Sequence, residues 1–250
     1  MYIRAVHAEG DPRDLRQLIR DNPLGLLTTA IHSKEHPFLQ SSHIPFVLDV
    51  DDEESDTDMG RLRGHLARQN PHSKAMIEEL SSDPEMHNVL EHDVLVIFTA
   101  QHHYVTPKFY TETKPSTGKV VPTWNYAAAQ VYGRARIYFD STSEETSEFL
   151  GQQISDLTRH AETSIMGYVG GDRPEGWKVT DAPERYVDIL KKSIIGIEIE
   201  VVRLEGKFKM SQEMGKGDRE GIIDGFYGLQ NDIGKQIGDI VRQRSEQNES

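Results

Sequence analysis

The sequence predicts a mainly β protein with flanking helices, an α+β fold built around a closed or nearly closed antiparallel barrel. Six or more segments have the composition of β-strands and are joined by short turns. Several of them alternate apolar with polar residues, which is the pattern of a strand with one face in the core. No linker rich in Gly, Pro or Ser separates these segments, so we expect them to form one sheet system.

The first strands are expected in the first third of the chain. One begins at residue 24, after the turn-forming Asp21-Asn22-Pro23, and runs to residue 31. A second is expected over 39–48. Residues 49–58 then carry seven acidic side chains in ten, which indicates a solvated hairpin loop. Residues 60–67 alternate again, so a further strand is predicted there.

The later strands are marked by β-branched and aromatic residues. Residues 94–98 form a continuous apolar run, as expected of a strand that is buried on both faces. Another strand is predicted at 131–139. A last one is predicted at 194–202, where isoleucine or valine alternates with glycine or glutamate.

The helices are predicted from their first turns. Pro71 suits the first turn of a helix. Ser143 has the character of an N-cap for an amphipathic helix that ends near residue 159, with two glutamates in its first turn. A final helix is expected at about 229–244. The predicted organisation is one domain over 1–250, with a helical insert at about 143–192 and a C-terminal helical extension at about 219–250.

Composition bounds the class of protein. The 250 residues carry a formal net charge of −13, hydrophobic residues make up 36%, and there is no cysteine. No run approaches the roughly 18 apolar residues of a membrane helix, and the first residues lack the apolar core of a signal peptide. The absence of cysteine excludes disulfides and thiolate metal sites. We therefore expect an intracellular protein with no membrane contact, located in the cytoplasm, with the nucleus left open.

The sequence also lacks the signatures of several function classes. The acidic balance argues against direct DNA binding, which rests on Lys and Arg side chains that neutralise phosphates. His102 and His103 are neighbours on an extended segment and point to opposite faces, and no metal-ligand spacing is present. There is no Gly-x-Ser-x-Gly, P-loop or Gly-x-Gly-x-x-Gly motif. No catalytic set can therefore be named, and a bound cofactor would carry any chemistry.

Two neighbouring segments combine rings with polar side chains. Residues 102–110 read His-His-Tyr-Val-Thr-Pro-Lys-Phe-Tyr, and residues 121–126 read Val-Pro-Thr-Trp-Asn-Tyr. A plain core strand would alternate apolar with polar residues, and a plain loop would carry fewer rings. Flat stacking surfaces beside hydrogen-bonding groups suit a planar, phosphorylated ligand.

These segments, together with Ser41-Ser42-His43-Ile44-Pro45-Phe46 and the stretch from Gly64 to Pro71, resemble the PaiB (Pai2) family of FMN-binding split-barrel proteins. Members of this family are often described as negative transcriptional regulators. The resemblance extends over roughly residues 22–218 and implies an antiparallel split β-barrel of the FMN-binding type. It also implies a homodimer that binds FMN at the subunit interface.

The phosphate of FMN needs cationic side chains and hydroxyl or backbone N–H donors. Arg68 is the leading candidate, because it precedes the N-terminus of the helix predicted to start at Pro71. A surface cap or ion pair is the alternative role for this arginine. The candidate hydroxyls are those of Thr28, Thr29, Ser41 and Ser42.

The flavin ring needs an apolar slot and hydrogen-bonding groups along its pyrimidine edge. Thr123, Trp124, Asn125 and Tyr126 are the candidates, and the amide of Asn125 offers both a donor and an acceptor. A tryptophan at such a position is also commonly a plug in the core. Two histidines on neighbouring predicted strands are placed to donate as well, namely His43 and His65.

A third group follows the last predicted strand. Lys209, Ser211 and Gln212 match the Lys-x-Ser-Gln segment of the family and offer a charge, a hydroxyl and an amide. Their alternative role is that of a solvent-facing turn. Three functions stay open: a flavin-binding regulator of the PaiB type, a flavin-dependent oxidoreductase or flavin reductase, and a haem-binding or haem-degrading split barrel.

Overall fold

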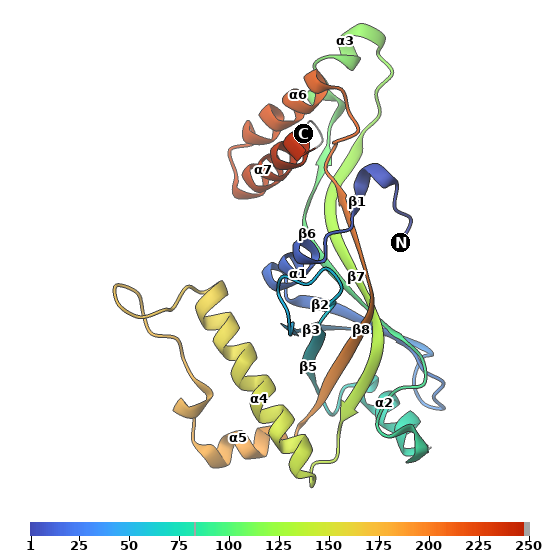
Figure 1. Cartoon of the computed structure of the whole chain (residues 1–250), viewed down its shortest axis with the longest axis vertical. Helices are drawn as coiled ribbons and strands as arrows, with labels where there is room; N and C mark the ends of the chain where they lie inside the picture. Colours follow the sequence, from blue (N-terminus) through green and yellow to red (C-terminus); the bar gives the residue numbers. More distant parts are fainter. Residues whose placement is uncertain (83, 248–250) are drawn as a thin grey trace. The chain divides into compact units, whose positions relative to one another are not determined.

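Figure 1 shows the computed structural model of the chain, which describes residues 1–82 and 84–247. The chain forms two compact units. We call residues 19–98 and 131–204 the barrel unit, and residues 1–18, 99–130 and 205–247 the terminal unit. The long strands β6, β7 and β8 contribute residues to both units, and each unit is described by itself below.

The sheet has the strand order β3-β2-β6-β7-β8-β5-β4. Its end strands β3 and β4 are consecutive in the chain and separated only by Phe46, so the sheet returns on itself and closes as a barrel. Each pair with a defined register is antiparallel; for example, Leu26 pairs with both His43 and Ile97. This confirms the predicted antiparallel split barrel. The strands are β2 (Leu24–Ala30), β3 (Leu39–Pro45), β4 (Val47–Asp49), β5 (Arg61–Ala67), β6 (Val94–Val105), β7 (Thr123–Tyr138) and β8 (Ile194–Lys209).

The barrel core follows from strand alternation. One side chain in two points inward, and those of Leu27, Ile44, Leu62 and Val96 are fully buried. Gly64 allows close packing, since a Cβ at this position would lie 2.9 Å from both Ile44 and Phe46. The predicted strands are thus found in position, but the one expected over 39–48 is divided at Phe46 into β3 and β4, and β6, β7 and β8 run further than the patterns indicated.

The helices of the barrel unit begin where the sequence predicts. Helix α2 (Pro71–Ser82) starts at Pro71, and helix α4 (Glu144–His160) is capped by Ser143, whose Oγ accepts a hydrogen bond from the Thr146 N–H at 3.5 Å. Helix α4 continues into a π-helical turn, Ala161–Ile165, and α5 (Glu184–Lys191) precedes β8. Short 3-10 turns are found at Pro84–Met86 and Val179–Asp181.

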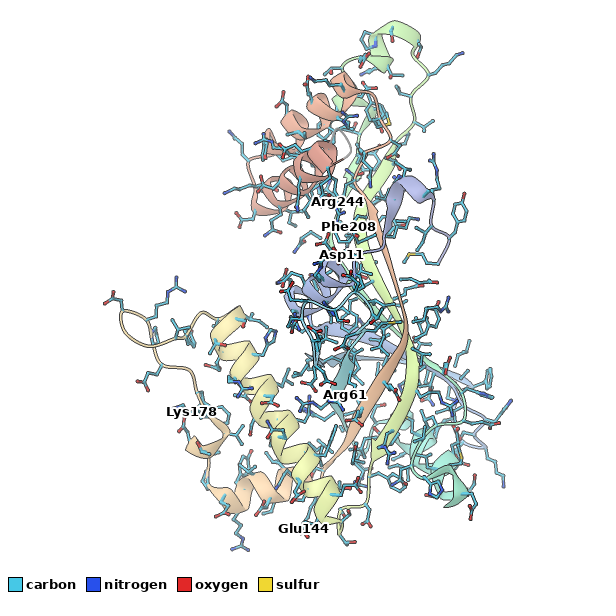
Figure 2. All side chains as sticks on the ribbon, viewed as in Figure 1. Asp11, Arg61, Glu144, Lys178, Phe208 and Arg244 are labelled. Atoms are coloured by element: carbon cyan, nitrogen blue, oxygen red, sulfur yellow. The ribbon has the colours of Figure 1, made fainter. Side chains whose placement is uncertain are left out.

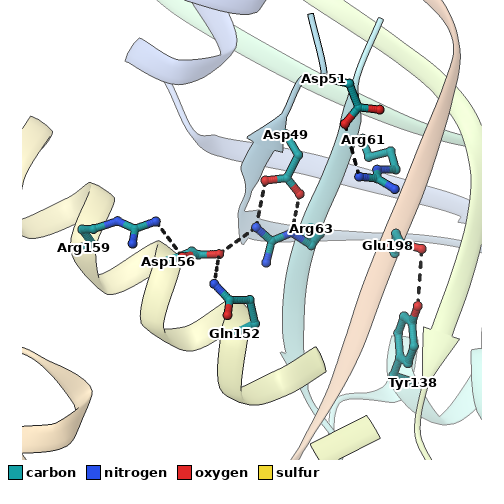
Figure 3. Close-up of polar contacts among 9 residues, drawn as sticks. All are labelled: Asp49, Asp51, Arg61, Arg63, Tyr138, Gln152, Asp156, Arg159 and Glu198. Atoms are coloured by element: carbon teal, nitrogen blue, oxygen red, sulfur yellow. Dashed lines mark hydrogen bonds and ion pairs between the residues drawn. The ribbon is translucent and has the colours of Figure 1, made fainter. Parts of the chain in front are cut away.

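An ion network fixes α4 on the outer face of the barrel (Figure 3). Arg63 of β5 pairs with Asp49 of β4 and, at 2.8 Å, with Asp156 of α4. About two turns back along the helix from Asp156, the Phe149 ring stacks on Tyr138 with centroids 3.9 Å apart. The acidic loop after β4 is itself hydrogen-bonded, because Asp58 Oδ2 accepts the backbone N–H of residues 51 and 52.

The terminal unit joins both ends of the chain. Strand β1 (Ala8–Glu9) pairs with the end of β8. Arg244 of α7 lies over the Phe208 ring at 3.9 Å (Figure 2). It also pairs with Glu9. No helix within residues 1–82 and 84–247 is long and apolar enough to span a membrane. The helical elements are a 3-10 turn Ala5–His7, α1 (Pro12–Asp21), whose last three residues belong to the barrel unit, a 3-10 turn Pro107–Phe109, α3 (Thr113–Thr117), α6 (Lys216–Tyr227) and α7 (Asp232–Gln247).

Candidate functional site

The terminal unit brings together the start of β7 and the end of β8, where seven of the predicted site residues lie. Lys209 Nζ donates to Thr123 Oγ1 at 2.5 Å and to the Trp124 carbonyl at 2.7 Å. Ser211 Oγ donates to Asn125 Oδ1 at 2.9 Å. Two segments 86 residues apart in sequence thus form one hydrogen-bonded cluster.

Strand alternation sorts the β7 residues onto two faces. Thr123 and Asn125 share the face that meets the end of β8, and Asn125 is fully buried. Trp124 and Tyr126 point the other way. The Trp124 side chain is 53% exposed, so it is not a plug in the core.

The outward face is lined by rings. The Trp124 ring has His102 at a centroid distance of 5.9 Å and Tyr104 at 6.2 Å, the latter edge-on. Lys207 Nζ lies 5.2 Å from the centre of the Tyr126 ring. These solvent-accessible rings offer stacking surface to a flat ligand.

The buried face carries an unused donor. Asn125 Nδ2 has no hydrogen-bond partner among the described residues, whereas the Oδ1 atom of the same amide accepts a hydrogen bond from Ser211. A buried polar group without a partner costs about 1–3 kcal/mol, so such an atom is expected where a ligand supplies the partner. Burial also lowers the pKa of the neighbouring Lys209.

The turn after β8 is shaped by its own side chains. The Gln212 amide accepts a hydrogen bond from the Met210 N–H at 2.6 Å and donates to the Phe208 carbonyl. Ser211 adopts a left-handed backbone with φ 61°. Lys209 itself is the last residue of β8 rather than part of the turn. Gln212 therefore stabilises the turn, while Ser211 and Lys209 reach across to β7.

Sequence reasoning missed a contact between a histidine and a carboxylate beside this cluster. His7 is buried, and its Nε2 lies 3.0 Å from Glu213 Oε2. The carboxylate of Glu213 has a pKa below its usual value, because hydrogen bonding and charge from His7 and the charge of Lys209 outweigh its burial. No local motif could have found this pair, since its members are 206 residues apart.

The four predicted hydroxyl side chains lie in the barrel unit, and they too point to two different faces of the sheet. Thr28 and Ser41 face outward, 2.8 Å apart. Thr29 and Ser42 face inward, where both bind the imidazole of buried His72, at 2.8 Å and 3.0 Å. Burial lowers the pKa of His72 to about 4, so this ring is neutral at pH 7. His72 was not among the predicted residues.

The remaining predicted residues also belong to the barrel unit. Arg68 donates through Nε to the Lys192 carbonyl at 3.2 Å and through Nη2 to the Phe139 carbonyl. It therefore links the residue after β7 to the turn before β8. His65 is half-buried, its Nδ1 has no hydrogen-bond partner in the described part of the chain, and burial lowers its pKa. His43 is exposed on the same face as Ser41.

The donor set of the terminal unit fits FMN in kind. It combines a cation at Lys209, an unpaired amide donor at Asn125 and exposed ring surface at Trp124. These match a phosphate or ring-edge anion, a pyrimidine carbonyl and the flat tricyclic ring, respectively. Within the described residues, no group of three or more His, Asp or Glu side chains is arranged to hold a metal ion.

The chain is similar to several known proteins along most of its length. An uncharacterized protein of Emericella nidulans is 61% identical over 252 residues, which cover 98% of both chains. The Bacillus subtilis protease synthase and sporulation protein PAI 2 is 23% identical over 244 residues, again 98% of both chains. The solved structure of the flavocytochrome Anf3 from Azotobacter vinelandii matches 83% of this chain and 72% of its own, with 10% identity and a TM-score of 0.46.

The family model described as "Putative FMN-binding domain" matches residues 1–203. This match covers the barrel strands and the ring-rich start of β7. It agrees with the resemblance of the sequence to the PaiB family, whose member PAI 2 aligns along almost the whole chain. The chain belongs to the family that this model describes.

Proposed function

We propose that the protein binds FMN as a resident cofactor and that a homodimer completes the binding site. The observation that carries this proposal is the buried amide donor of Asn125, which has no partner among the described residues and lies one residue from the exposed Trp124 ring. Family membership supports the same ligand.

In this proposal each residue of the cluster has one task. Asn125 Nδ2 donates to the pyrimidine edge of the flavin, and the Trp124 ring, which points to the other face of β7, offers its stacking surface to the flavin of the second copy. Lys209 supplies positive charge, and the Ser211 hydroxyl holds the Asn125 amide in its orientation. When bound, the flavin supplies electron or hydride transfer, and these side chains bind and orient it.

The physiological role that we infer is that of a flavin-binding regulator located in the cytoplasm. The charge of −13 supports action through protein contacts rather than direct contact with DNA. A flavin-dependent oxidoreductase is the second candidate, favoured by the exposure of Trp124 and Tyr104, because an open ring-lined face would admit a reductant.

The test begins with the purified protein. Its ligand is released by heat and identified by absorbance and mass, and the dimer is measured by sedimentation equilibrium. A colourless protein that fails to bind added FMN would contradict the proposal, and a Soret band would indicate haem instead. Reduction of the bound flavin by NADH or NADPH within seconds in stopped flow would favour the oxidoreductase; inertness would favour the regulator.

A further inference from the structure

The insert between β7 and β8 carries a concentration of exposed apolar side chains. Seven large hydrophobic residues in a stretch of 26 are each about half exposed. They fall in two groups, one in the segment that follows α4 and one on α5, and exposed apolar groups of this kind mark interaction sites. We call them the insert face: Ile165, Met166, Val169, Trp177, Tyr186, Ile189 and Leu190.

Helix α5 shows that this face lacks a partner. The helix has eight residues, and none of them is buried in the described structure. Tyr186, Ile189 and Leu190 follow helical spacing and form one apolar stripe. An isolated helix of this length is marginal in water, so it needs packing against another surface. Its link to α4 is a hydrogen bond from Lys191 Nζ to Ser147 Oγ at 3.1 Å.

The rest of the insert face is held in place by hydrogen bonds and is hollowed. Glu162 accepts the Tyr168 N–H through its carbonyl at 2.8 Å and the Trp177 N–H through its carboxylate at 3.1 Å. Tyr168, Val169 and Trp177 line a hollow of about 540 Å³. A preorganised surface with a pocket can receive an apolar side chain of a partner.

Charge indicates which kind of partner fits. The insert segment 165–192 contains five acidic and five basic residues, so its net charge is zero, whereas the whole chain carries −13. Two copies of an acidic chain repel each other over most of their surface, and a neutral apolar region is where they can meet.

The barrel unit has a second uncovered apolar face. Leu24 and Leu39 are 58% and 65% exposed, and Leu26, which pairs with His43, is half-buried. No acidic residue, Lys or Arg lies in β2 or β3. Thr28, Ser41 and His43 point to this same side. We call this surface the sheet face.

We propose that the insert face of one copy packs on the sheet face of a second copy, reciprocally across a twofold axis. Each copy has one insert face and one sheet face, so this contact, made twice, covers all four apolar faces of the dimer. Contacts between like faces would leave two of the four exposed to water. The insert of the second copy would lie over Thr28, Ser41 and His43. These three polar side chains of the sheet face would therefore be covered only in the dimer. This inference rests on the homodimer of the proposed function.

The first experiment uses three aspartate variants. Ile189→Asp and Leu39→Asp should each raise the dimer dissociation constant at least about tenfold in sedimentation equilibrium, because a charge would be buried in the contact. The matched control is Ile233→Asp, an isoleucine on α7 with 46% exposure, which should leave the constant unchanged. Circular dichroism melts show that each variant is folded.

Mixing distinguishes the proposed contact from one between like faces. An Ile189→Asp chain and a Leu39→Lys chain should form mixed dimers more tightly than either does alone, because one of the two contacts then pairs aspartate with lysine. Failure of mixing to restore dimers, or a wild-type constant for Ile189→Asp, would overturn the inference. FMN absorbance of the wild type is read separately, so loss of flavin binding would count against the proposed function instead.

Discussion

Ser211 Oγ donates to Asn125 Oδ1 at 2.9 Å, which leaves Asn125 Nδ2 as a buried donor without a partner in the described structure. In this arrangement the serine hydroxyl donates to the amide oxygen, so the amide nitrogen is the end that stays free. The left-handed backbone of Ser211 brings that hydroxyl back towards β7. The position of one turn residue therefore decides the orientation of the proposed ligand donor.

Asn125→Asp should weaken FMN binding by about tenfold to a hundredfold. The aspartate still accepts from Ser211, but it replaces the free donor with an acceptor that repels a flavin carbonyl. Isothermal titration of the apoprotein measures the change. Asn231→Asp is the matched control, because Asn231 Oδ1 accepts the Gly234 N–H at the start of α7 and aspartate can do the same. Equal affinity of wild type and Asn125→Asp would rule out this donor.

Arg68→Ala tests the predicted phosphate anchor. If Arg68 holds the phosphate, FMN binding should fall about tenfold to a hundredfold while riboflavin binding stays nearly unchanged. The variant should also lower the free energy of unfolding by about 1–3 kcal/mol, since two backbone carbonyls lose a donor. Parallel titrations with FMN and riboflavin separate the two effects. Equal weakening of FMN and riboflavin binding would contradict a phosphate role for Arg68 and would point to Lys209 as the phosphate-binding residue. Lys114→Ala serves as the control at an exposed lysine.

His72 should make stability fall on acidification. Its folded pKa of about 4 lies below the ordinary 6.5, so the unfolded chain binds the proton first. Its contribution is fully present above pH 6.5 and is lost as the pH falls towards 4, by roughly 3 kcal/mol in all. Urea unfolding at pH 7 and pH 4.5 measures this. His72→Gln should flatten the slope and the exposed His43→Gln should not; an unchanged slope in His72→Gln would refute the assignment.

Arg63→Ala should be strongly destabilising. It leaves Asp49 and Asp156 without the cation between them, and the Asp156 side chain is only 7% exposed. Removing one partner of a buried ion pair costs about 3–5 kcal/mol. Arg159 also pairs with Asp156, but its side chain is 72% exposed, so Arg159→Ala should cost less than about 1 kcal/mol. Denaturant midpoints compare the two variants, and similar losses would contradict the proposed role of burial.

The sequence by itself determined the elements whose signals are local. Pro71 and Ser143 begin helices in the structure because their backbone preferences act within one turn. The alternation in 60–67 placed β5, since a strand with one face in the core must repeat every two residues. The resemblance to the PaiB family rested on the same kind of short, contiguous segments.

Only the tertiary structure decided which side chains meet. Adjacent residues of a strand face opposite ways, but the packing of α2 determines that Thr29 binds buried His72 while Thr28 remains on the outer face. The ends of β7 and β8 likewise meet through Ser211 and Asn125, 86 residues apart. Such pairings depend on how distant segments pack, and local sequence patterns do not encode that packing.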